Sequence, residues 1–208
     1  MKLSSEDLTQ LAQMLAFAGN SLLKPMNQTS TVGLDAAFWG DLPSFESEEA
    51  ASTLDVLAAW ASAIDEERSE DAVRGLSVEY ARLFMGPPEP AVMPWETFYA
   101  EEGSDTGFGE QAFAMVQRLR SLGLSVSNDN NQYADHIGIE LLYVSECLKR
   151  ASQGDDSLLR EAAAFSRDSA IPWMRSFSAR VYEADSTYYS MLSRLACALL
   201  SVVAAQAD

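Results

Sequence analysis

Three side chains in one short segment, Asp135, His136 and Glu140, have the types and spacing that most resemble a chemical site. His136 and Glu140 stand four residues apart, which places them on one face of a helix, and Asp135 adjoins the histidine. A histidine beside carboxylates can act as a general acid or base, or contribute to a metal site. A structural pair on the helix surface fits the same spacing, so both interpretations stay open.

A metal-dependent reading of this cluster is incomplete. A metal ion normally takes three or four protein ligands, and His136 is the only histidine of the chain. Cys147 and Cys197 lie far apart without CxxC spacing, which predicts two reduced thiols and not a metal or disulfide pair. A small helical metal-dependent hydrolase using Asp135, His136 and Glu140 therefore remains one alternative, and no covalent chemistry is the main expectation.

A nucleotide site is not expected either. Gly107, Phe108 and Gly109, followed by Ala112, match the loose dinucleotide fingerprint, but that motif has meaning only between a strand and a helix. No strand is predicted before it, and the acidic residues that precede it would repel a pyrophosphate. No GxxxxGK[ST] loop occurs in the chain.

The elements that must position the cluster are predicted to be helices, in an all-α fold of one domain covering residues 1–208. Apolar residues recur at helical spacing, and composition favours helix. Ser4 and Asp7 form a capping-box variant ahead of a helix that should stop near Pro25. Later helices are expected at about 47–68, at a segment ending with Phe84, and at about 109–122, 131–151, 157–166, 171–183 and 186–204, with a short helical turn at Phe38 and Trp39.

An irregular loop divides these helices. The sequence from Gly86 to Gly109 has little periodicity and contains an acidic, glycine-punctuated run at 101–107, which predicts a hinge between two helical halves. Such a hinge allows a monomer or a domain-swapped dimer, because the same contacts can form between chains. Four prolines restrict the loop, and its aromatic groups could thus be presented to a peptide ligand at small ordering cost. Packing between helices is an equally good explanation for Trp95 and Tyr99.

Charge limits the partners. The 14 Lys and Arg residues against 31 Asp and Glu give a net charge of −17, which repels phosphate backbones and anionic lipid and attracts cationic ligands. Nucleic acid is therefore not an expected partner. The N-terminal sequence lacks the basic and apolar regions of a secretory signal, and the apolar run 195–205 is shorter than the roughly 18 residues of a spanning helix. We expect a cytoplasmic protein without stable membrane insertion.

Several segments together resemble one family. Glu79-Tyr80-x-x-Leu83-Phe84-x-Gly86-Pro87, then Pro94-x-Glu96-x-x-Tyr99, and later Asp135-His136-x-x-x-Glu140-Leu141 are similar to the signature segments of the TorD/DmsD/NarJ family of cytoplasmic chaperones. Ile171-Pro172-Trp173 and Phe177 resemble that family's C-terminal segment. Two positions depart from it: Glu101-Glu102 stand where relatives of the dimethyl-sulfoxide-reductase type carry a basic residue, and Ser169 stands near a frequent histidine.

The resemblance implies a function. Such a chaperone binds the N-terminal twin-arginine leader of the catalytic subunit of a molybdenum-cofactor oxidoreductase and holds it for cofactor insertion before export. It implies no cofactor beyond weak guanine nucleotide binding. The peptide-binding residues would be Tyr80, Leu83, Phe84, Pro94, Trp95, Glu96, Tyr99, Asp135, His136 and Glu140.

The expected roles within this set differ. We expect the rings of Phe84 and Trp95 to face the ligand and not the core, and Asp135 to accept from a leader guanidinium. His136 would make affinity depend on pH, because an unperturbed histidine titrates in the physiological range. A general assembly adaptor that binds a folded partner through the same patch is a further alternative.

Overall fold

The computed structural model describes residues 2–64, 69–86, 90–100, 109–126, 132–184 and 187–207. Within these ranges the regular elements are all helical, and one isolated antiparallel bridge joins Trp95 to His136. The all-α prediction is confirmed. The α-helices are α1 (Ser5–Leu23), α2 (Ala36–Gly40), α3 (Glu48–Ser62), α4 (Ser69–Phe84), α5 (Glu110–Ser121), α6 (Ile137–Ser152), α7 (Asp156–Phe165), α8 (Ile171–Glu183) and α9 (Tyr188–Ala204). Shorter turns are η1 (Met26–Gln28), η2 (Val32–Leu34), η4 (Glu96–Tyr99), η6 (Ser166–Ala170) and η7 (Ala205–Ala207).

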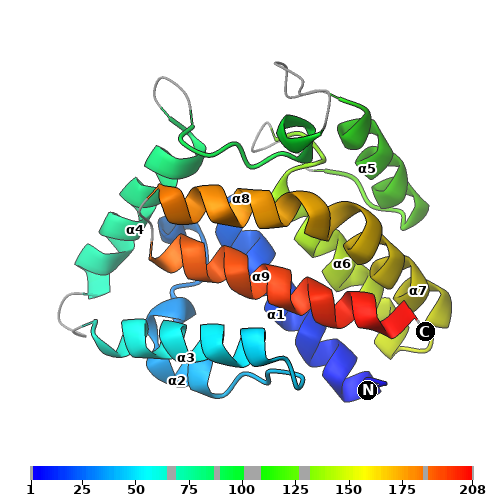
Figure 1. Ribbon diagram of the computed structural model, residues 1–208, viewed down its shortest axis with the longest axis horizontal. Helices are drawn as coiled ribbons and strands as arrows, with labels where there is room; N and C mark the ends of the chain where they lie inside the picture. Colours follow the sequence, from blue (N-terminus) through cyan, green and yellow to red (C-terminus); the bar gives the residue numbers. More distant parts are fainter. Residues whose placement is uncertain are drawn as a thin grey trace.

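Helix α9 lies at the centre of the arrangement. It runs beside α8 and across α1 in Figure 1, and it also packs against α3 and α7. The apolar run 195–205 contributes to the core, since Leu195, Leu199 and Val203 are buried. Residues 90–100, which include η4, pass above α8 on the upper side of Figure 1, so the candidate site lies at that edge of the helical layers.

The first helix begins and ends as its sequence predicts. The Ser4 side chain accepts from the Asp7 amide at 3.1 Å, and the Asp7 carboxylate accepts from the Ser4 amide at 2.9 Å, which completes the capping box. Leu23 is the last helical residue, two positions before Pro25.

Two boundaries differ from expectation. Helix α3 begins after its cap Ser47 but ends at Ser62, well before residue 68. Helix α6 begins at Ile137 and not near 131, because residues 134–135 form a turn in which the His136 amide donates to the Tyr133 carbonyl at 3.2 Å. Residues 87–89 and 101–108 of the predicted hinge lie outside the described residues.

Helices α7 and α8 are joined without a break. The five residues of η6 form a π-helical turn that connects Phe165 to Ile171, where a separation between two helices was predicted. Pro172 lies in the first turn of α8, directly after the π-helical turn.

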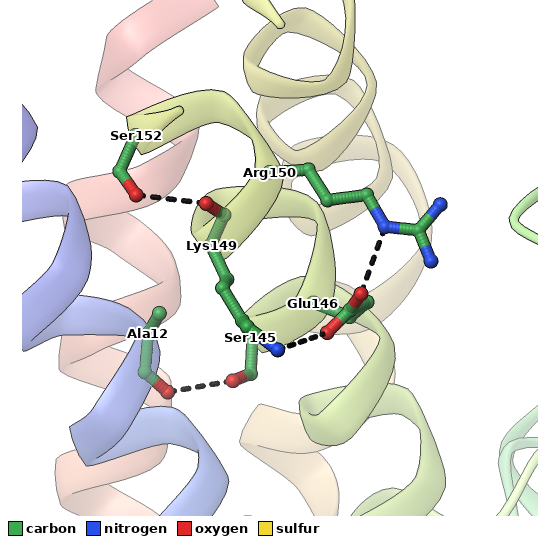
Figure 2. A network of polar contacts seen from close by, with 6 residues as sticks. All are labelled: Ala12, Ser145, Glu146, Lys149, Arg150 and Ser152. Carbon is green, nitrogen blue, oxygen red and sulfur yellow. Dashed lines mark hydrogen bonds and ion pairs between the residues drawn. The ribbon is translucent and has the colours of Figure 1, made fainter. Parts of the chain in front are cut away.

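The backbones of α1 and α6 approach each other at two glycines. A Cβ built on Gly138 would lie 2.5 Å from the carbonyl oxygen of Gly19, and one built on Gly19 would lie 2.9 Å from that of Gly138. Further along the same helix pair, Ser145 Oγ donates to the Ala12 carbonyl at 2.7 Å (Figure 2). Only glycine permits so close a crossing, and both helices are held in register by it.

The other face of α6 is polar. Glu146 accepts from Arg150 Nε at 2.8 Å and from Lys149 Nζ at 3.5 Å, as Figure 2 shows, and Ser152 Oγ donates to the Lys149 carbonyl. The Arg150–Glu146 contact is partly buried and the other two are exposed, and such contacts stabilise a helix weakly. Packing against α1 and α7 therefore sets the position of α6.

We expect Gly138→Ala to lower the free energy of unfolding by about 1 to 3 kcal/mol, because the new methyl group would meet backbone atoms that cannot rotate away. Gly75→Ala is the matched control, since Gly75 lies in α4 with no atom within 4 Å of its built Cβ. That change should stabilise the protein by about 0.5 to 1 kcal/mol. Urea unfolding of the two variants provides the measurement, and equal stability changes would contradict the glycine crossing.

Candidate functional site

Backbone hydrogen bonds fasten the loop after α4 to the start of α6. The Ile137 amide donates to the Pro94 carbonyl at 2.9 Å, and the Glu96 amide donates to the Asp135 carbonyl at 3.0 Å. At its other end the loop returns to α4, where the Val92 amide donates to the Leu83 carbonyl at 2.9 Å. The two motifs that are 40 residues apart in sequence thus form one site.

Asp135 holds the first turn of η4. Its Oδ2 accepts from both the amide (3.0 Å) and the hydroxyl (2.5 Å) of Thr97, and the side chain is completely buried. Burial raises the pKa of the carboxyl, while the Thr97 bonds oppose that rise. Its second oxygen, Oδ1, is buried without a hydrogen-bond partner. Direct contact with a leader guanidinium would have to use that oxygen.

His136 caps α6. Its Nδ1 accepts from the Gly138 amide at 3.0 Å, which satisfies one of the free donors at the helix start. Complete burial lowers the pKa of the imidazole to about 3, so the ring is neutral at physiological pH with its proton on Nε2. The expectation that His136 provides pH dependence in the physiological range is therefore wrong.

Two carboxyl groups meet beside this cap. Glu140 is buried, and its Oε2 accepts from Trp173 Nε1 at 3.0 Å. The carboxyl group of Glu96 lies within hydrogen-bonding reach of Glu140, and the negative charge of Asp135 is close to both. Burial is the main cause that raises the pKa of Glu96 to about 7 and that of Glu140 well above its usual value.

A shared proton satisfies this pair. The Oε1 atom of Glu140 is buried and has no donor when both carboxyls are ionised. A proton held between Glu96 and Glu140 supplies the missing hydrogen bond and removes one of two neighbouring negative charges. The titrating group of the site in the physiological range is thus a carboxyl pair and not the histidine.

The aromatic residues of the loop divide between packing and surface. Tyr99 donates to the Met93 carbonyl at 2.9 Å, its ring lies 5.3 Å from that of Trp173, and the Arg180 guanidinium lies 4.7 Å above it. Tyr99 therefore joins the loop to α8. Pro94 is buried at the bridge to α6.

Trp95 remains partly accessible. Its ring is half-buried, with neighbouring rings of His136 at 5.8 Å, Phe98 at 5.9 Å and Tyr133 at 6.5 Å. Tyr133 is 42% exposed, and the indole Nε1 of Trp95 has no partner. Trp95, Phe98 and Tyr133 form what we call the aromatic patch.

The helix face of α4 does not contribute to this surface. Tyr80 donates to the Leu22 carbonyl at 3.2 Å, Leu83 is completely buried, and the Phe84 ring stacks 5.8 Å from Phe177. The expectation that the Phe84 ring faces a ligand is wrong, because only 4% of the side chain is exposed. These three residues connect the loop to the core.

A small cavity opens next to Glu96. It has a volume of about 230 Å³ and lies between η4, α5 and η6, with Glu110, Arg118, Phe165 and Ser169 among its lining residues. The Arg118 guanidinium lies 4.9 Å above the Phe165 ring and pairs with Glu161.

Sequence reasoning missed several members of the site. Thr97 and Arg118 gave no signal beyond their places in a loop and a helix, whereas Trp173 stood inside the C-terminal segment that resembled the family. Across the described ranges, no group of three or more His, Cys, Asp or Glu side chains is arranged to hold a metal ion.

Fold and site together define an all-helical protein whose loop and helix N-terminus form one polar and aromatic site. Comparison with known sequences gives the family: the model of the nitrate reductase delta subunit family matches residues 46–179. The chain belongs to this family, the TorD/DmsD/NarJ group that its motifs resemble.

Two relatives from the sequence comparison agree with that assignment. The chain is 27% identical over 172 residues to the chaperone protein TorD of Shewanella piezotolerans, covering 78% of this chain and 74% of the relative. It is 27% identical over 165 residues to the chaperone protein TorD of Shewanella pealeana, covering 76% and 70%. A crystal structure of a candidate redox enzyme maturation protein from Archaeoglobus fulgidus aligns with 97% of this chain and 96% of its own, at 19% identity and a TM-score of 0.48.

We expect Glu140→Gln to stabilise the protein at high pH. A carboxyl whose pKa is raised by folding stabilises the folded state below its unfolded value, and this contribution is lost as pH rises through the folded value. For Glu96 this loss of stability takes place between about pH 4.5 and about pH 7. The variant, which places an amide donor beside Glu96, should match the wild type near pH 4.5 and exceed it by about 1 to 3 kcal/mol at pH 8.

Urea unfolding at each pH measures the difference in free energy of unfolding between the Glu140→Gln variant and the wild type. Buried His136 has a lowered pKa and so acts in the opposite direction, losing stability as pH falls below about 6.5. Asp55→Asn, on the exposed side of α3, controls for the change in net charge. A stability difference that does not change between pH 4.5 and 8 would contradict the shared proton.

Proposed function

We propose that this protein is a cytoplasmic chaperone that binds the twin-arginine leader of a molybdenum-cofactor oxidoreductase and holds that enzyme until its cofactor is inserted, before export. The proposal makes it a binding protein and not an enzyme. Membership of the family and the relatives named chaperone protein TorD support the maturation role. The leader, the cytoplasmic location and the absence of catalysis are our inference.

One observation carries the proposal: the loop 90–100 and the N-terminus of α6 are joined into a single site that combines accessible aromatic rings with carboxyl groups. The two backbone bonds at Pro94 and Asp135 fix this arrangement. Trp95 of the aromatic patch directly precedes Glu96 in the chain, and we infer that one ligand reaches both. A segment with arginines beside an apolar stretch has the matching chemistry.

The charge of the whole chain favours the same ligand. With a net charge of −17 the protein attracts cationic peptides over distances comparable with the Debye length, about 8 Å at physiological ionic strength. Among the described residues no helix is long and apolar enough to cross a bilayer. Association in solution with an arginine-containing segment is the binding mode we propose.

Trp95→Ala should weaken binding of a twin-arginine leader peptide by about tenfold or more, because it removes the largest ring of the aromatic patch. Trp60→Ala is the matched control: Trp60 is also half-buried, but it lies on α3 against Tyr188, at a ring distance of 5.0 Å. Calorimetric titration gives the affinities, and thermal melts report stability.

Two results bear on the interpretation of this test. Unchanged affinity in a Trp95→Ala protein with a large loss of melting temperature would return Trp95 to a packing role and contradict the proposal. Phe84→Ala should instead lose about 3 to 5 kcal/mol of stability, because its ring is in the core.

Association with the leader should slow as salt rises. Steering by opposite charges raises association rates most at low ionic strength, and screening removes it. A peptide with both arginines replaced by glutamine should associate more slowly at low salt and lose most of this dependence. Stopped-flow mixing at several salt concentrations measures both rates. Identical rates for the two peptides at every salt concentration would indicate that the arginines are not recognised, as a general adaptor would behave.

A further inference from the structure

The cavity beside Glu96 has the features of a site for one guanidinium group. Glu96 and the exposed Glu110 both line it, and Glu96 is half-buried. Behind it stand two further carboxyls, Asp135 and Glu140, which are 0% and 1% exposed. Each of these two carboxylates has one buried oxygen without a hydrogen-bond partner. A guanidinium group brings up to five donors in a planar fork.

The charged groups around Glu96 decide what the cavity can accept. Helix α5 presents Glu110 and Arg118, and the Arg118 charge is paired with Glu161 of α7. The α6 segment contributes Asp135 and Glu140, η6 contributes the neutral Ser169, and α8 contributes the indole donor of Trp173. With Arg118 paired, the remaining charges that face the cavity are negative, which favours a cation.

We propose that this cavity binds a leader arginine, and that its guanidinium group displaces the proton of Glu96, while the proton of Glu140 that the two carboxyls share stays in place. The inference rests on the proposed function and specifies its chemistry. In the free protein the proton lowers the repulsion between carboxyls. When the guanidinium group arrives, its donors satisfy Glu96 instead, the proton of Glu96 passes to the solvent buffer, and Glu140 keeps its own proton and its bond from Trp173.

The exchange predicts a pH-dependent affinity with a defined sign. With the pKa of Glu96 at about 7, roughly a tenth of the protein has this carboxyl ionised at pH 6 and most of it does at pH 8. The affinity of a ligand that requires ionised Glu96 is reduced in proportion to the fraction of protein in which Glu96 is ionised. The leader peptide should therefore bind about tenfold more weakly at pH 6 than at pH 8.

The test is calorimetric titration with a twin-arginine leader peptide in buffers of different ionisation enthalpy. At pH 6 the observed heat should depend on the buffer with a slope that corresponds to release of nearly one proton per peptide, and the slope should approach zero at pH 8. Glu96→Gln, an isosteric change, should abolish the release and the pH dependence. Glu110→Gln removes a charge from the same cavity and should retain the release.

The outcomes separate this inference from the proposed function. Binding of the leader at pH 8 with no proton release at pH 6 overturns the guanidinium exchange and leaves the chaperone proposal standing. Proton release that is equal for a peptide with both arginines replaced by glutamine also overturns it. No binding of the leader at either pH overturns both proposals. Release that is lost in Glu96→Gln and in the glutamine peptide, but retained in Glu110→Gln, supports the exchange.

Discussion

Gly19 and Gly138 bring the backbones of α1 and α6 into direct contact, and the candidate site inherits its position from that contact. Gly138 is also the residue whose amide is capped by His136, so one glycine serves the helix crossing and the helix start. The cap fixes Asp135, Asp135 fixes Thr97, and Thr97 fixes η4. A chain of short contacts therefore runs from the helix core to the loop that carries Trp95.

The electrostatics of the site differ from those of the rest of the protein. Across the surface the excess of acidic groups is solvated, and an ionised carboxylate costs little there. Around Glu140 the same kind of group is buried beside two others, where ionisation of all three would be costly. The tendency of these carboxyl groups to ionise thus conflicts with their buried environment. Such conflicts are more common at functional sites than in a structural core.

Much of this arrangement could be predicted from the sequence because it follows from local chemistry. The capping box at Ser4 and the bounds of α8 depend on nearby residues, and both are confirmed. The direction in which a ring faces does not depend on nearby residues alone. Phe84 and Trp95 belong to adjoining motifs, yet Phe84 is in the core and Trp95 reaches the surface. The neutral state of His136 likewise depends on burial by distant segments, which helical spacing cannot reveal.

The resemblance to the chaperone family identified the segments of the candidate site but not the role of each residue within them. The residues of the α4 motif connect the loop to the core, whereas those of the α6 motif cap a helix and hold η4. Thr97 and Arg118 were missed because their importance comes only from contacts between elements. A motif can therefore mark a site correctly while most of its members act by positioning others.

The π-helical turn η6 sets the angular relation between α7 and α8. A wider turn accommodates an extra residue without breaking the helix, and each residue rotates an α-helix by about 100°. Removal of one residue from this turn would keep a continuous helix but rotate all of α8 relative to α7. Trp173 would then leave Glu140 and lose its ring contact with Tyr99. The length of this one turn, more than any side chain in it, determines which face of α8 meets the acidic cluster.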